Sequence, residues 1–178
     1  LNLAHEIMIA FVSKKLTKNN INGINIISKA AGINGMIAGQ AVDIESEGKS
    51  IDIDTMKFIH SNKTGALIEA SIVAAAVMSD ADDTRIAALK TYAKYIGLAF
   101  QITDDILDIE GNEAELGKKI GSDELNDKAT YPKYFGLEKS KEYAKNTITN
   151  AIESLNVFEP REKAFFVDLA DYIICRKK

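Results

Sequence analysis

The sequence predicts an all-α protein, and three observations support this prediction. Only two prolines occur in 178 residues, so little in the chain interrupts helix formation. Apolar residues recur at helical spacing, and runs that alternate apolar and polar residues as strands do are scarce. Hydrophobic residues make up 46% of the chain and charged residues 27%, the balance of a folded globular protein. The length fits one domain, so we expect residues 1–178 to form a single helical unit.

The N-terminal part is expected to form two helices. The first covers about 1–16 and begins within an amphipathic pattern, without a cap residue, so we interpret Leu1 as an internal position of a longer chain. The second covers about 24–45. Small residues on one stripe of it would let another helix approach closely, namely Ala31, Gly35, Ala38 and Gly39.

Five further helical segments follow. They are expected at about 54–62, 64–78, 84–109, 137–156 and 161–177. The first two of these look like collinear pieces with a break between them. Residues 110–130, rich in glycine and charge, are the only candidate for a long functional loop. Pro160 is well placed at the start of the last helix.

The composition excludes several classes of function. A net charge of −4 gives no general attraction to nucleic acid or to anionic membranes, which favour basic proteins. A single cysteine, Cys175, forms no internal disulfide, and with two distant histidines, His5 and His60, it makes no zinc cluster. This cysteine usage indicates a reducing, cytoplasmic setting. No apolar run reaches the ~20 residues that a membrane span needs.

Three carboxylates lie close together on the helix expected at 84–109. At about 100° per residue, Asp108 and Gln101 lie within about 60° of Asp104, and Asp105 lies about 100° round in the same direction. The opposite side is apolar, so the helix should be mostly buried. Clustered buried carboxylates need cations, either Lys or Arg partners or a hard metal such as Mg²⁺. The alternative is a solvated acidic face paired with lysines.

The triplet Lys63-Thr64-Gly65 falls at the expected break between two helical pieces. A lysine, a hydroxyl and the free backbone N–H groups of a helix N-terminus together suit an anion such as phosphate. The alternative is a threonine N-cap beside an incidental surface lysine.

The candidate loop carries cations just after the carboxylate cluster. Residues 117–123 read Gly-Lys-Lys-Ile-Gly-Ser-Asp, and Lys128 follows shortly after. Lysines in this position would grip a phosphate from the side opposite a metal. The alternative is a mobile polar loop with balanced charges.

Gln40 and Asp43 lie three residues apart, on one face of the helix expected at 24–45. Such a pair on a helix rich in small residues is often only a buried interhelical hydrogen bond.

At these four motifs, in this order, the sequence resembles the trans-isoprenyl diphosphate synthases, particularly bacterial farnesyl diphosphate synthases. The resembling stretches are residues 35–49, 59–72, 95–111 and 117–140, and the match continues into the final LADYIICRKK. The resemblance implies a helical barrel around a deep cavity, assembled as a homodimer. It also implies that an allylic diphosphate is held by three Mg²⁺ ions between two aspartate-rich motifs, and that isopentenyl diphosphate is the second substrate.

The resemblance assigns a role to each candidate residue. Asp104 would be the direct metal ligand, supported by Asp105, Asp108, Gln101 and Asp123. Lys63, Lys118 and Lys128 would clamp the allylic diphosphate. Thr64, Gln40 and Asp43 would lie near the allylic carbons or steady Lys63, and Phe100 would touch the isopentenyl unit.

The sequence departs from this family in one respect, because it contains neither a first aspartate-rich motif nor the basic residues that bind isopentenyl diphosphate. It corresponds to the C-terminal part of the single synthase domain, so we expect residues 1–178 alone to be inactive. Three alternatives stay open: a non-catalytic partner subunit of a prenyl synthase, a class I terpene cyclase and a purely structural helical bundle. Product length cannot be read from these residues.

Overall fold

The computed structural model describes residues 1–111 and 128–176, and all regular structure in these two ranges is helical. The all-α prediction is confirmed. The elements are α1 (Asn2–Lys14), α2 (Lys18–Ala31), α3 (Met36–Ser46), α4 (Ile53–Ile59), the π-helix η1 (His60–Gly65), α5 (Ala66–Met78), α6 (Asp83–Glu110), α9 (Tyr131–Phe135), α10 (Leu137–Glu153) and α11 (Pro160–Cys175).

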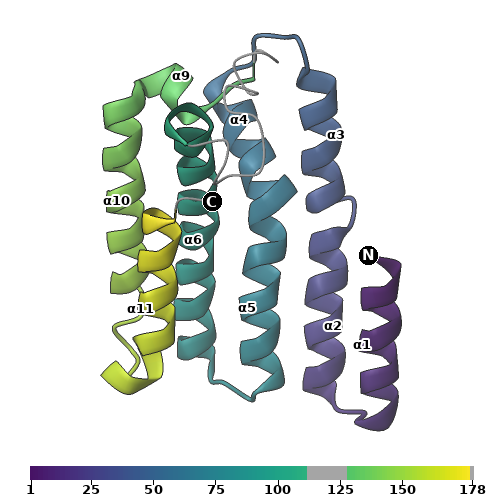
Figure 1. The fold of residues 1–178 in the computed structure, drawn as a ribbon. Helices are drawn as coiled ribbons and strands as arrows, with labels where there is room; N and C mark the ends of the chain where they lie inside the picture. Colours follow the sequence, from purple (N-terminus) through teal and green to yellow (C-terminus); the bar gives the residue numbers. More distant parts are fainter. Residues whose placement is uncertain (112–127, 177–178) are drawn as a thin grey trace.

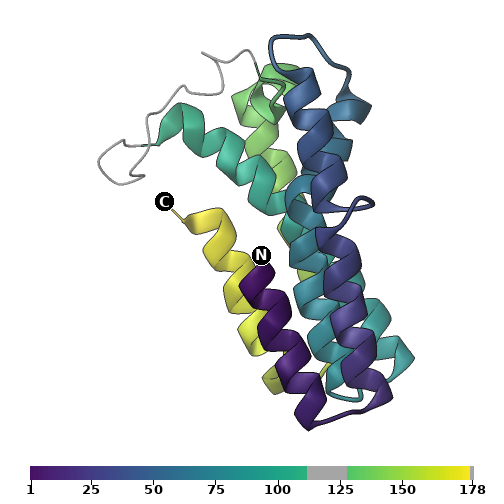
Figure 2. The same ribbon diagram turned by 90° about the vertical axis from the view of Figure 1, so that its right-hand side faces the viewer.

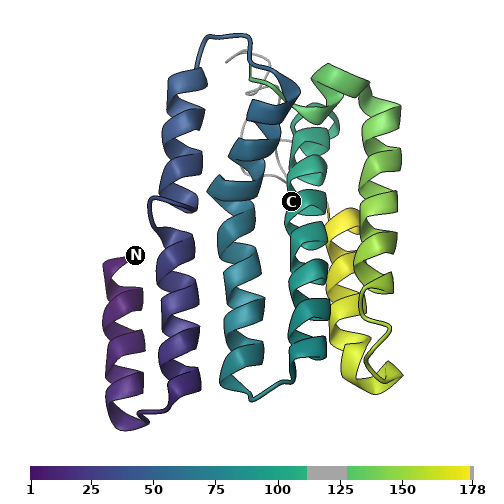
Figure 3. The ribbon, with the colours of Figure 1, turned by 180° about the vertical axis from the view of Figure 1, so that it is seen from behind.

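Most of the helices stand side by side in one row. Figures 1 and 3 show the order α2, α5, α6, α10 across the row, with α3 continuing α2 upward and α4 continuing α5. Helices α1 and α11 lie on the same side of this row, as Figure 2 shows. Helices α3 and α4 and the second half of α6 lie in the upper half of the fold in Figure 1.

The prediction of one continuous helix over residues 24–45 is wrong. A turn at 32–35 divides it into α2 and α3. Gly32 ends α2 in an extended conformation, and the chain then passes so close to α2 that a Cβ on Gly35 would lie 2.1 Å from the Ala30 carbonyl oxygen. The two glycines therefore permit a tight turn here. The short helix α9 was not predicted.

The break predicted between 62 and 64 is also wrong. Helix α4 begins at Ile53, and the side chain of its N-cap residue Asp52 accepts a hydrogen bond from Thr55 N at 2.7 Å. The helix runs through η1 into α5 without interruption. Lys63 and Thr64 therefore lie inside a helix, away from any free N-terminal N–H groups. Helix α6 approaches this helix closely at Gly97, because a Cβ on Gly97 would lie 3.1 Å from the Gly65 Cα atom.

Two apolar clusters hold α6 in place. The lower one is centred on the fully buried Tyr92, which donates a hydrogen bond to the Phe166 carbonyl oxygen at 2.6 Å and so ties α6 to α11. The upper one joins α4, α6, α9 and α10 through Met56, Ile102, Ile106, Tyr131 and Ala144. This upper cluster fixes the half of α6 that carries the aspartates.

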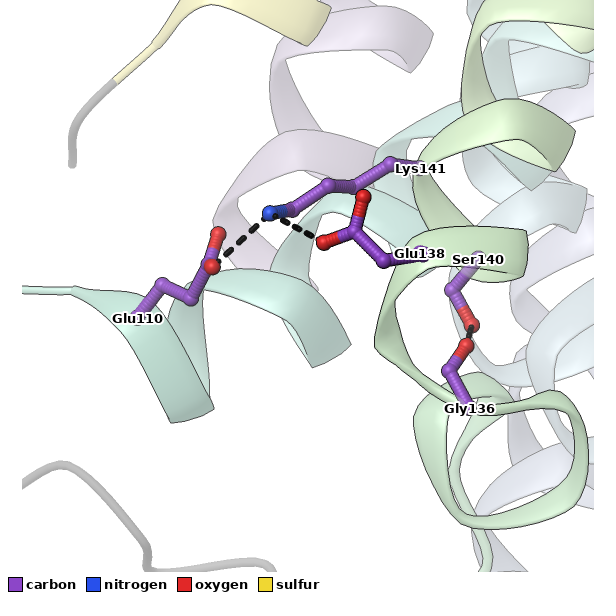
Figure 4. Close-up of polar contacts among 5 residues, drawn as sticks. All are labelled: Glu110, Gly136, Glu138, Ser140 and Lys141. Atoms are coloured by element: carbon purple, nitrogen blue, oxygen red, sulfur yellow. Dashed lines mark hydrogen bonds and ion pairs between the residues drawn. The ribbon is translucent and has the colours of Figure 1, made fainter.

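A salt bridge network closes the top of the fold between α6 and α10. Lys141 contacts Glu110 at 2.8 Å and Glu138 at 3.1 Å, and the nearby Ser140 hydroxyl donates to the Gly136 carbonyl oxygen at 2.9 Å (Figure 4). The pKa of Lys141 is raised, chiefly by the hydrogen bond to Glu110. The last residue of α6 is thus held against the first turn of α10.

None of the described helices, over residues 1–111 and 128–176, combines the length and apolarity needed to cross a membrane.

Helix α3 meets η1 backbone to backbone at Gly39. A Cβ on Gly39 would lie 2.1 Å from Lys63 N and 2.7 Å from Lys63 Cα. The small residue predicted at this position therefore allows the close helix approach that the sequence indicated, and the helix that approaches carries Lys63.

We expect Gly39→Ala to lower the free energy of unfolding by about 1–3 kcal/mol, because the added methyl forces α3 away from η1. Urea denaturation followed by circular dichroism measures this. Gly65→Ala is the matched control, since its Cβ would meet nothing nearer than 3.3 Å. Equal stability of the Gly39 variant and the parent would contradict the close approach.

Candidate functional site

A cavity of about 390 Å³ opens between α3, α4, η1 and α6, and the residues that precede α9 close one side of it. Seven of the twelve residues singled out in the sequence line this cavity: Asp43, Lys63, Thr64, Gln101, Asp104, Asp105 and Lys128. They come from four separate segments of the chain. The sequence motifs are therefore brought together in one place.

On the first wall, Lys63 is held in position by Asp43. The Lys63 Nζ atom donates to Asp43 Oδ2 at 2.5 Å, and both side chains are mostly shielded from solvent. This contact crosses from η1 to α3, so the interhelical bond expected of Asp43 is made with a lysine. Gln40 is exposed and does not line the cavity. The pairing points the ammonium group toward the cavity and steadies it there.

On the opposite wall, the three aspartates of α6 differ in their surroundings. Asp104 lines the cavity with its side chain 39% exposed, whereas Asp105 and Asp108 are buried. Burial of two carboxylates contradicts the solvated acidic face that the sequence left open. Asp108 does not line the cavity, so its predicted role, if any, is indirect.

Asp105 has a clear structural partner. Its Oδ2 atom accepts a hydrogen bond from Tyr131 N at 2.9 Å, in a buried position. This bond joins α6 to the first residue of α9 and so places the preceding Lys128 at the edge of the cavity.

His60 and Tyr131 are site residues that the sequence reasoning missed. His60 lines the cavity, and its ring stacks on that of Tyr131 with centroids 5.9 Å apart. Burial raises the pKa of Tyr131 to about 12, with a smaller contribution from the negative charge of Asp105. The only sequence signal was the position of Tyr131 three residues after Lys128.

Arg176 was missed as well. It extends from the end of α11 to Asp104, with 3.6 Å between its Nη2 atom and Asp104 Oδ1, and it stacks on the ring of Phe100. Phe100 is half-buried and does not line the cavity. The basic ending Arg-Lys-Lys was a signal for such a contact.

The two remaining predicted residues, Lys118 and Asp123, lie outside the described residues.

Three or more His, Cys, Asp or Glu side chains do not converge as a ready metal site anywhere in the described parts of the chain. Carboxylates do line the cavity, and on α6 Asp104 is more accessible than the buried Asp105. Mg²⁺ binds through one or two carboxylates, keeps several waters and takes further oxygens from substrate phosphates. The residues present therefore fit Mg²⁺ held jointly with a phosphorylated ligand.

Comparison with known proteins places the chain in a family. It matches the Polyprenyl synthetase family over residues 3–166. Geranylgeranyl pyrophosphate synthase of the chloroplast from Catharanthus roseus is 43% identical over 151 residues, which cover 84% of this chain and 42% of that protein. The family model covers most of the chain, so the chain belongs to the polyprenyl synthetase family.

Solved structures of related proteins have the same fold as this chain. The apo crystal structure of an FPP/GFPP synthase from Zymomonas mobilis superimposes with a TM-score of 0.80 at 33% identity, covering 97% of this chain and 57% of that one. The geranyltransferase from Helicobacter pylori, complexed with magnesium and isoprenyl diphosphate, gives 0.78 at 27% identity, covering 97% and 56%. The chain therefore spans about half the length of the relatives it matches.

We expect the free energy of unfolding to fall as the pH rises from 10 to 12. An unfolded tyrosine loses its proton near pH 10.0, whereas folded Tyr131 keeps it until about 12. Each pH unit in this window should cost on the order of 1 kcal/mol. Tyr131→Phe has no such proton and should show a shallower fall in urea titrations at each pH.

The matched control for this prediction is Tyr172→Phe, which changes an exposed tyrosine of α11 and should follow the parent. If the Tyr131 and Tyr172 variants lost stability equally above pH 10, the burial of the Tyr131 hydroxyl would be refuted.

Proposed function

We propose that these residues form one wall of a Mg²⁺-dependent prenyltransferase site, which condenses an allylic diphosphate with isopentenyl diphosphate. The observation that supports this most is the single cavity in which Asp104 and Asp105 face Lys63 and Lys128. A diphosphate carries charge of the sign that lysines bind and oxygen atoms of the kind that Mg²⁺ shares with carboxylates. The magnesium and isoprenyl diphosphate bound to the Helicobacter pylori relative support the same assignment.

In the proposed reaction, the allylic C–O bond breaks and both of its electrons leave with the diphosphate. The double bond of isopentenyl diphosphate then attacks the allylic carbon, and the released diphosphate takes the proton that is lost. Mg²⁺, when bound, supplies positive charge to the leaving group. Lys63 and Lys128 add hydrogen bonds that strengthen as negative charge develops on the diphosphate.

The chain's own residues have three tasks in this scheme. Asp104 would hold the metal, and Asp105 would hold the segment that carries Lys128 through its bond to Tyr131. Asp43 orients Lys63. The apolar lining from α4, which includes Met56 and Ile59, would keep water from the carbocation.

The product is proposed to be farnesyl or geranylgeranyl diphosphate. The Catharanthus roseus relative is a geranylgeranyl pyrophosphate synthase by name, and the Zymomonas mobilis one is an FPP/GFPP synthase. We propose the cytoplasm as the compartment, although the Catharanthus roseus enzyme is chloroplastic. Three Mg²⁺ ions are expected with substrate bound.

We propose that the protein works as a homodimer. The first helices leave large apolar side chains exposed: Leu3, Ile7, Phe11, Ile33, Ile37 and Ile44. Exposed apolar surface of this extent marks association sites. A non-catalytic partner subunit and a terpene cyclase are less well supported, because the cavity keeps both the aspartates of α6 and the diphosphate-binding lysines.

Lys63→Gln and Lys128→Gln should each weaken binding of a non-reactive allylic diphosphate analogue about tenfold in the presence of Mg²⁺, since a charged hydrogen bond contributes about 1.5–3 kcal/mol. Without Mg²⁺ the binding should be too weak to separate the variants. Calorimetric titration measures both conditions. Lys139→Gln, an exposed lysine of α10, is the control and should bind as the parent does. Unchanged affinity in both cavity variants would show that these lysines do not bind the diphosphate.

Asp104→Ala and Asp108→Ala should separate catalysis from folding in the natural protein that contains these residues. Replacing the half-exposed Asp104 should lower mainly the turnover number. Replacing the buried Asp108 should lower the melting temperature, and it should lower turnover about 10–100-fold because of its supporting role. Steady-state kinetics and melting temperatures measured on both variants decide the assignment. A larger loss of turnover for Asp108→Ala would reverse the two roles.

The 178-residue chain by itself should make no prenyl diphosphate, because its sequence lacks the first aspartate-rich motif and the basic isopentenyl site. Radiolabelled isopentenyl diphosphate, extracted after incubation with an allylic diphosphate and Mg²⁺, measures any product. Sustained turnover by protein of the verified 178-residue mass would overturn this expectation.

A further inference from the structure

Arg176 is a buried cation placed directly on the acidic wall of the cavity. Only 10% of its side chain is exposed, and its guanidinium carbon lies 4.0 Å from the centre of the Phe100 ring. Its Nη2 atom donates to the Phe100 carbonyl oxygen at 3.2 Å and lies 3.6 Å from Asp104 Oδ1. The end of α11 is thus joined to the aspartate-bearing part of α6 by one side chain.

These contacts differ from those of an ordinary surface ion pair. Burial lowers the pKa of Arg176, the charge of Asp104 works against that effect, and the buried Nε atom has no hydrogen-bond partner in the described ranges. A desolvated guanidinium is costly unless aromatic and carboxylate groups compensate for the lost water. Here Phe100 supplies the aromatic face and Asp104 supplies the charge.

The contact with Asp104 is also loose. At 3.6 Å it is longer than a charge-assisted hydrogen bond of about 2.7–2.9 Å, and no two-pronged contact between guanidinium and carboxylate is formed. Asp104 keeps 39% of its side chain exposed on the cavity side. A second cation can therefore reach the carboxylate from the cavity.

We propose that Arg176 is a displaceable counter-cation for Asp104, which pairs with this carboxylate until a divalent metal takes it. A carboxylate that binds Mg²⁺ at about 2.0–2.1 Å brings the metal close to the guanidinium, and like charges at that range repel. Metal binding then expels Arg176. This inference rests on the proposed function, because it takes Asp104 as the metal ligand.

Displacement of Arg176 has a second effect. The same side chain covers the ring of Phe100, so its departure uncovers that ring. Arg176 therefore couples the charge at Asp104 to the exposure of the Phe100 ring. It acts as a positioning residue in this scheme, since it works through Asp104 and Phe100.

The first test measures affinity for a divalent metal in the presence of a fixed, saturating concentration of a non-reactive allylic diphosphate analogue, because the site holds the metal jointly with a phosphorylated ligand. Mn²⁺ shares the preference of Mg²⁺ for oxygen ligands, and electron paramagnetic resonance measures the concentration of free Mn²⁺. Arg176→Gln should bind Mn²⁺ up to about fivefold more tightly than the parent, the range expected for a partly exposed pair. Arg176→Lys should fall between them, because it keeps the charge and loses the stacking. Arg161→Gln, an exposed arginine of α11, is the matched control.

The second test follows the end of α11 directly. Cys175 is exposed and is the single cysteine of the chain, so a nitroxide spin label attaches there alone. In the parent, Mg²⁺ added together with the diphosphate analogue should increase the mobility of the label as Arg176 leaves Asp104, whereas the analogue without Mg²⁺ should not. In Arg176→Gln the label should be mobile before metal is added. A parent label whose mobility does not change while the site fills would overturn the proposal.

A third variant separates this inference from the proposed function. Asp104→Asn should abolish the high-affinity Mn²⁺ site if Asp104 is a metal ligand. Metal binding that depends on Asp104 but is equal, or weaker, in Arg176→Gln overturns the role of Arg176 alone. Mn²⁺ affinity that is the same in Asp104→Asn and in the parent overturns both proposals. Circular dichroism of each variant shows that the comparison is made on folded protein.

Discussion

The hydrogen bond from Tyr131 N to the buried Asp105 carboxylate is the contact on which the site depends. A buried carboxylate is unfavourable without donors, so this bond anchors α9 to α6. Anchoring α9 brings Lys128 to the cavity, and the stacking of Tyr131 on His60 continues the contact to η1. One charged group in the core thus positions a second helix, a lysine and one wall of the cavity.

Much of the fold could be predicted from helical periodicity, and its failures have physical reasons. The long helix α6 was found because apolar residues surround its aspartates on a consistent helical period. The turn at 32–35 was missed because its cause is a close approach of the chain to Ala30. The break predicted between 62 and 64 is absent, because α4, η1 and α5 form one continuous helical run. Gly39 and Gly97 permit the close approach of a neighbouring backbone inside a helix, and only the fold distinguishes this use of glycine from a chain break.

The candidate site was predicted in its composition and less well in its contacts. The motifs identified Lys63, Gln101 and Asp104 because polar residues on mostly apolar helices stand out in a sequence. Spacing predicted only that Asp43 forms a hydrogen bond between helices, and the family resemblance alone connected it with Lys63, twenty residues away. Arg176 reaches Asp104 across 72 positions of the chain, and no local pattern could pair them. Long-range partners of this kind follow from helix packing, which spacing alone does not contain.

The π-helical turn at His60–Gly65 bears on how the site can change in evolution through the loss of a residue. A π-helical turn is equivalent to one extra residue accommodated within an α-helix, and such turns are common at functional sites. The surrounding helices α4 and α5 keep their own hydrogen-bond pattern on either side. Loss of one residue from this turn would restore a regular helix and leave the packing of α5 on α2 and α6 in register. The irregularity is therefore local: losing it would change the direction of Lys63 and Thr64 and the close contact of Gly39 with the Lys63 backbone, while the helices on either side keep their own pattern.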